Sequence, residues 1–85
     1  MSEKLYNKIG GENGMTLEVQ DFYNVEFLIV DERRDYVAGR YRGFEKTKHE
    51  LEVMVYRMKE QFEPYKMTAY QSIDHPTEIV IKASV

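Results

Sequence analysis

Apolar and polar residues alternate over several stretches in the first half of the chain. In residues 15–20 and 23–30, apolar side chains recur at every second position, and Asp21 breaks the phase between the two stretches. A period of two is typical of β-strands that bury one face. Residues 36–42 resume the alternation after a polar loop at 31–35, which predicts a hairpin. The first half of the chain is therefore expected to form strands of one sheet.

A helix is predicted from about residue 47 to residue 63. Thr47 and Glu50 have the spacing of a capping box, in which each side chain accepts a hydrogen bond from the other residue's backbone N–H. Pro64 cannot continue a helix. The apolar residues between these signals fall on one stripe, which comprises Leu51, Met54, Val55, Met58 and Phe62. A strand over residues 50–58 is the alternative, but its alternation fails at Arg57, so we favour a helix that packs this stripe into the core.

Two further strands are predicted after Pro64, because alternation returns at 67–70 and at 79–84. The loop at 72–77 contains Pro76 and suits a hairpin connection. The order strands, helix, strands predicts an α+β fold in which an antiparallel sheet of about four to five strands packs on one helix. Both phases of 23–30 carry apolar side chains, so the sheet face opposite the helix also needs a cover. A second copy of the chain is the economical candidate, which makes a homo-oligomer an expectation.

Residues 1–14 are predicted to be a flexible N-terminal arm, and residues 15–85 a single domain. The arm contains three of the five glycines and few apolar side chains. Leu5, Tyr6 and Ile9 would share one side of a short helical turn if the arm became ordered on another surface. We therefore regard these three residues as candidate partner-binding residues.

The composition excludes several classes of protein. A chain of 85 residues has room for one core. Without cysteine it has no disulfide framework and no thiolate metal site. The longest apolar run is four residues, at 27–30, which is too short for a membrane span or a signal sequence. We expect a soluble, cytoplasmic protein with no membrane association.

Basic residues are concentrated between positions 33 and 59. This segment carries eight basic and four acidic side chains, although the net charge of the chain is −3. Guanidinium groups can bind phosphates and aromatic rings can stack on bases. The segment's candidate nucleic-acid or nucleotide-phosphate site comprises Arg33, Arg34, Tyr36, Arg40, Tyr41 and Arg42. On a regular strand Arg40 and Arg42 would share one face with Tyr36, while Val37 and Tyr41 would share the other. The isoelectric point of 5.4 argues against general affinity for duplex DNA.

Two short family resemblances touch this segment. VAGRYRGFE at 37–45 resembles the first signature of Sm-like RNA-binding proteins, although the chain departs from that family downstream, where His49 stands in place of an Asn. Gly43 and Phe44 followed by the capping box are similar to the strand-to-helix junction in the arm-binding domains of tyrosine recombinases. Both resemblances imply nucleic-acid binding, which is the alternative function.

No catalytic or metal-binding set emerges from the sequence. His49 is placed in the first helical turn and His75 in a hairpin loop, and neither has an evident nucleophile beside it. Asp31, Glu32 and Asp35 lack the spacing and the glycine of a calcium loop. We therefore predict that the chain is not an enzyme and needs no cofactor or metal.

The favoured interpretation is a small non-enzymatic module that binds a macromolecular partner, most simply a protein. Acidic side chains outside 33–59 and seven tyrosines suit contact with a basic protein surface. Tyr56 lies off the helical stripe and is expected to be exposed as a partner-binding residue. An accessory or inhibitory protein of a mobile element would fit this profile.

Overall fold

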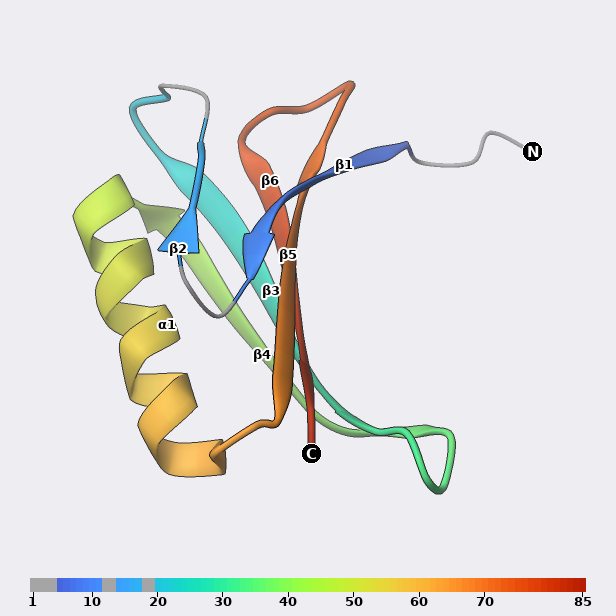
Figure 1. Ribbon diagram of the computed structural model, residues 1–85. Helices are drawn as coiled ribbons and strands as arrows, with labels where there is room; N and C mark the ends of the chain where they lie inside the picture. The colour runs from blue at the N-terminus through green and yellow to red at the C-terminus, as the bar shows by residue number, and fades with distance from the viewer. Residues whose placement is uncertain (1–4, 12–13, 18–19) are drawn as a thin grey trace.

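The computed structural model describes residues 5–11, 14–17 and 20–85, which form an α+β fold with one helix and a six-stranded sheet (Figure 1). The strands lie in the order β2-β1-β5-β6-β3-β4. β3 and β6 are parallel, and every other neighbouring pair is antiparallel. The sheet is therefore mixed and has more strands than the antiparallel sheet of four to five strands predicted from the sequence. The strand bounds are β1 Tyr6–Gly11, β2 Gly14–Met15, β3 Tyr23–Asp31, β4 Tyr36–Lys46, β5 Lys66–Ser72 and β6 Glu78–Ser84.

The predicted helix is confirmed as α1, Lys48–Phe62, with Thr47 as its N-cap. The Thr47 hydroxyl accepts a hydrogen bond from Glu50 N, and Glu50 Oε1 accepts one from Thr47 N, both at 3.2 Å. At the other end Glu63 adopts a left-handed conformation, and its N–H donates to Lys59 O, which closes the last turn. At 15 residues, α1 is too short and too polar to cross a bilayer, and it is the one helix in the described residues.

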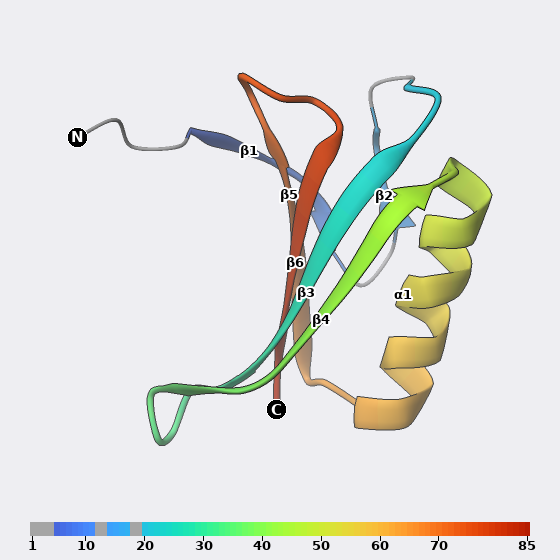
Figure 2. The same cartoon turned by 180° about the vertical axis from the view of Figure 1, so that it is seen from behind.

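The position of α1 follows from the direction of the strands. β4 and β5 run the same way, because both are antiparallel to the parallel pair formed by β3 and β6. The chain must therefore cross over β3 and β6 between β4 and β5, and α1 makes this crossing on one side of the sheet (Figures 1 and 2). The described elements leave the opposite face of the sheet uncovered.

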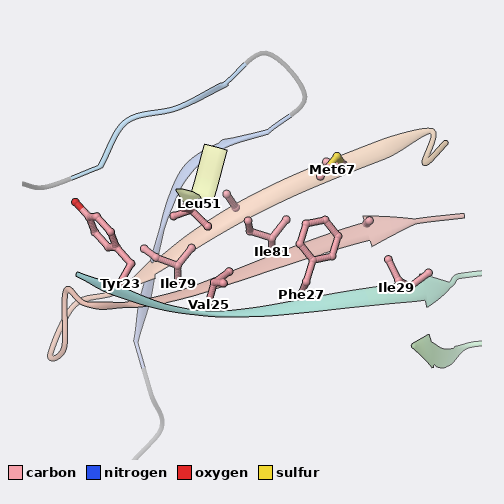
Figure 3. Packing of buried hydrophobic residues seen from close by; sticks show 10 residues of the cluster. Tyr23, Val25, Phe27, Ile29, Leu51, Met67, Ile79 and Ile81 are labelled. Atoms are coloured by element: carbon pink, nitrogen blue, oxygen red, sulfur yellow. The ribbon is translucent and has the colours of Figure 1, made fainter. Parts of the chain in front are cut away.

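The core fills the space between α1 and the sheet. Leu51, the buried residue of α1, lies over the strand residues Val25, Ile79 and Ile81 (Figure 3). Phe27 and Tyr23 complete the centre of the cluster and are at most 1% exposed. Burying a side chain such as Phe27 contributes roughly 1.5–3 kcal/mol. The remaining stripe residues of the helix pack against this cluster as predicted, so Met54, Val55, Met58 and Phe62 belong to the core side.

The N-terminal segment differs from its prediction. Tyr6–Gly11, assigned to a flexible arm, forms strand β1, which pairs with β5 and turns back into β2. A glycine is needed at position 10, because a Cβ there would lie 2.1 Å from the Gly14 carbonyl oxygen. Pairing to the β5 backbone compensates for the shortage of apolar side chains in β1. The predicted strand over 15–20 is reduced in the described residues to β2, and residues 1–4, 12–13 and 18–19 lie outside the description.

β4 is the long edge strand of the sheet, and the turn that joins it to β3 projects beyond the other strands (Figures 1 and 2). Its register against β3 shifts twice. One shift leaves Ala38 without a partner residue, and the other sets Phe44 and Glu45 opposite Asn24. Glu45 has φ = 52°, and its N–H donates to Asn24 Oδ1 at 3.0 Å. These two bulges decide which side chains of β4 reach each face.

Candidate functional site

The uncovered side of the sheet, which we call the open face, carries the even-numbered residues of β3. Val25, Phe27 and Ile29 point into the core, so the alternation of the strand places Glu26, Leu28 and Val30 on the open face. Residues opposite one another in the register share a face, and this assigns the neighbouring strands. The open face thus includes Lys8, Glu26, Leu28, Val30, Arg40, Arg42, Tyr70, Val80 and Lys82.

Two of the predicted phosphate-binding arginines lie on the open face, and both are paired with one carboxylate. Glu26 Oε2 is 3.2 Å from Arg42 Nε, and Glu26 Oε1 is 3.7 Å from Arg40 Nε. The arginine side chains remain more than half exposed. A phosphate approaching this pair would have to compete with Glu26 for both guanidinium groups.

The two tyrosines of the predicted phosphate site do not join these arginines. Tyr41 faces the helix side, where its ring contacts that of Phe62 with centroids 5.7 Å apart. The bulge at Ala38 changes the phase of β4, so Val37 lies opposite Val30 on the open face and Tyr36 lies opposite Asp31. The prediction that Tyr36 shares a face with Arg40 and Arg42 is therefore wrong, because it assumed an unbroken alternation.

Arg33 and Arg34 lie in the projecting turn, apart from the arginines of β4. Arg34 N donates to Asp31 Oδ1 at 3.2 Å, and Arg34 Nε lies 3.8 Å from Asp31 Oδ2. This pair fixes the turn locally, as an Asp at the start of a turn commonly does. The six residues of the predicted phosphate site therefore occupy three places: the turn, the open face and the helix side of β4.

A shallow hollow of about 400 Å³ lies on the open face near one end of β3. Tyr6, Arg42 and Phe44 contribute to its lining together with Glu26 and Val80. Phe44 is 67% exposed, a high value for an aromatic side chain. The structure thus brings Tyr6, predicted to bind a partner through the arm, together with Arg42 from the predicted phosphate site.

The other predicted partner-binding residues are distributed over different surfaces. Leu5 is exposed, and its carbonyl oxygen accepts a hydrogen bond from Ile73 N at 3.0 Å. Ile9 is partly buried and packs against the core. Tyr56 is 62% exposed on α1, and hydrogen bonding to Glu60 raises its pKa above the usual value. The segment forms a strand and not the expected helical turn. Because side chains alternate between the two faces of a strand, Leu5, Tyr6 and Ile9 do not share one side.

Sequence reasoning missed the residues that complete the open face. Glu26, Leu28 and Val80 carried no motif, and their roles depend on which strands become neighbours. The apolar character of both phases of 23–30 was the available signal, and it indicated an uncovered second face. Within the described ranges, no group of three or more His, Asp or Glu residues could hold a metal ion.

Comparison with protein-family models, with curated proteins and with solved structures found no significant match to this chain.

Proposed function

We propose that this chain is a non-enzymatic protein-binding module that docks a partner protein on the open face of its sheet. The observation that carries the proposal is the one-sided position of α1, which leaves the opposite face of a six-stranded sheet without a covering element in the described residues. Leu28, Val30, Tyr70 and Val80 are half-buried there instead of enclosed, and Phe44 is largely exposed. Exposed apolar and aromatic side chains on an uncovered sheet face favour association with another protein.

The arrangement of charge on the open face supports the same proposal. Charged side chains are interspersed with the apolar ones on this face: Lys82 lies opposite Leu28, and Glu26 lies opposite Val80 and pairs with Arg40 and Arg42. A surface that mixes apolar and charged side chains is typical of non-obligate protein interfaces, and arginine is enriched in them. The molecule extends 34 × 34 × 21 Å, so one broad face can supply the roughly 800 Å² per partner that a standard interface buries.

Site-specific photo-crosslinking in the cells that make the protein tests the proposal. A photo-reactive residue at Leu28 should capture one protein of defined mass. Adding Val80→Arg should abolish this capture, because an extra charge would be buried in the interface. Tyr56→Arg is the matched control on the helix side and should leave the capture unchanged. If Tyr56→Arg abolishes the capture and Val80→Arg does not, the partner binds at α1, which would contradict the proposal.

Nucleic-acid binding is the alternative that the same protein can test. Binding of a fluorescent single-stranded oligonucleotide at low and high salt would reveal a phosphate-dependent site. We expect weak binding at low salt, because the guanidinium groups of Arg40 and Arg42 are already paired with Glu26. Tight, salt-sensitive binding that disappears in the Arg40→Ala, Arg42→Ala variant would favour the alternative function.

A further inference from the structure

The free side of β4 is a second surface on which the protein can accept a partner. Within the described residues β4 pairs only with β3, so its other side is an edge of the sheet. Edge strands present backbone N–H and C=O groups that can pair with an added strand. The two bulges of β4 limit the regular part to residues 39–43, which pair without interruption with residues 25–29 of β3. This five-residue stretch is the segment whose free edge can accept another strand in register.

A groove of about 480 Å³ adjoins the end of this stretch at Arg42 and Gly43. Its walls come from β4 and from α1, and its apolar lining includes Val53, Met54 and Met58. Val53 lies off the stripe that packs into the core and is half-buried. Side chains of an added strand that pointed toward the helix would therefore meet apolar groups. Methionine side chains adapt readily to different apolar partners.

Positive charge surrounds the groove although the whole chain carries −3. Lys46 and Arg57 line it together with one carboxylate, that of Glu50, whereas Arg42, also in the lining, pairs its guanidinium with Glu26 on the open face. Glu50 Oε1 accepts hydrogen bonds from the Thr47 backbone N–H and hydroxyl, so this carboxylate is engaged in capping α1. These bonds, with Lys46 and His49 nearby, lower the pKa of Glu50. The basic segment noted in the sequence is thus partly gathered along the β4 edge.

We infer that the β4 edge and its groove bind an extended acidic peptide of a partner protein, which adds to the sheet as a strand beside β4. Main-chain hydrogen bonds to residues 39–43 would supply part of the affinity, and alternate side chains would supply specificity. One set of side chains would enter the groove against Val53 and Met54, and the other would lie beside Arg40 and Arg42. Carboxylates in the second set would face the two arginines across the strand pair, in competition with Glu26. This site lies outside the centre of the open face and goes beyond the function proposed above.

A designed peptide tests the inference without knowledge of the natural partner. The probe is a fluorescein-labelled octapeptide that alternates valine and glutamate, and the readout is fluorescence anisotropy with the full-length protein. We expect the Lys46→Glu, Arg57→Glu variant to bind about tenfold more weakly or worse. Lys59→Glu reverses one charge on the other flank of α1, half the charge change of the double variant, and should bind as the wild type does. The corresponding valine–lysine peptide should not bind.

Backbone methylation of the probe distinguishes strand addition from simple charge attraction. Two further peptides carry N-methyl groups on one or the other alternate set of residues. Strand addition predicts that one of them fails to bind and the other binds normally, because one set of N–H groups faces β4. Chemical-shift changes for the wild type should concentrate at the amides of residues 39–43.

Three outcomes would overturn the inference: no binding by the wild type, equal binding by both methylated peptides, or binding that ignores Lys46→Glu, Arg57→Glu. The free protein could also prove to be a dimer that pairs through β4 and that excess peptide does not dissociate. That result would overturn the inference and show that a second copy of the chain occupies this edge. Failure of the open-face proposal leaves these results unaffected, because Val80→Arg and the groove variants alter different surfaces.

Discussion

At the scale of single residues, Glu32 connects the ends of three strands. Its Oε1 accepts a hydrogen bond from Ser84 Oγ at 2.8 Å, and its Oε2 accepts one from the Tyr65 hydroxyl at 2.5 Å. The Tyr65 bond is the larger cause, and the Ser84 bond the next, of a lowered pKa for Glu32, with smaller contributions from Lys66 and Lys82. Glu32 directly follows β3, Ser84 ends β6 and Tyr65 precedes β5. The ionised carboxylate therefore stabilises the folded state.

The pH dependence of this contribution has a definite sign. A carboxyl whose pKa is lowered by folding stabilises the protein above its unfolded pKa, and the stabilisation disappears as the pH falls through the folded pKa. We expect Glu32→Gln to lower the melting temperature at about pH 7 and to differ less from the wild type at about pH 3. Melting curves followed by circular dichroism measure both differences. Tyr65→Phe, which removes the principal donor, should show the same trend, and a deficit equal at both pH values would contradict the assignment.

The position of a site residue could be predicted from the sequence only where neighbouring residues in the chain determine it. Exposure of Tyr56 followed from the helical stripe, because the neighbours of a helix residue lie three and four positions away. The pairing of Glu26 with Arg40 and Arg42 depends instead on the register between β3 and β4. The bulge at Ala38 lies beside Gly39, and a glycine inside a strand can mark a bulge, but the local sequence did not show that it would move Tyr36 to a different face. The sequence therefore showed which residue types could form a site, but not which of these residues lie close together in the fold.

At the scale of elements, the N-terminus of α1 depends on Thr47. Its hydroxyl satisfies the N–H of Glu50, one of the N–H groups that a helix start leaves without an intrahelical partner. We expect Thr47→Ala to lower the free energy of unfolding by about 1 kcal/mol, measured by urea denaturation. Thr47→Ser keeps the hydroxyl and should stay close to the wild type. An unchanged urea midpoint for Thr47→Ala would show that tertiary contacts of α1 make the cap dispensable.

Elements specified by nearby residues were predicted well from the sequence. The capping box and Pro64 defined α1 closely, and the loop at 72–77 correctly joined β5 to β6. The strand order was not predictable in the same way, since parallel pairing of β3 with β6 arises from the crossing of α1 over the sheet. β1 was missed because its stability comes from backbone pairing with β5, about 60 residues later in the chain. Long-range pairing leaves little trace in local hydrophobic periodicity.

At the scale of the whole molecule, β1 covers an edge that would otherwise be exposed. The inner strands β5 and β6 pair with each other, and β1 occupies the remaining side of β5. Without β1, β5 would present a seven-residue edge containing Met67, Ala69 and Tyr70. An uncovered edge of this length promotes pairing between molecules. The N-terminal strand therefore covers the β5 edge and leaves β4 as the long free edge.

Two substitutions within the N-terminal segment test this role. Ile9 packs against the core, whereas Leu5 is 57% exposed. We expect Ile9→Lys to lower the free energy of unfolding by about 1–3 kcal/mol, because it places a charge where an apolar group is packed. As β1 detaches, concentration-dependent association should appear in sedimentation velocity. Leu5→Lys introduces the same side chain at an exposed position and should change stability by less than about 0.5 kcal/mol. Equal behaviour of the two variants would contradict a role for the Ile9 side chain in holding β1 against β5.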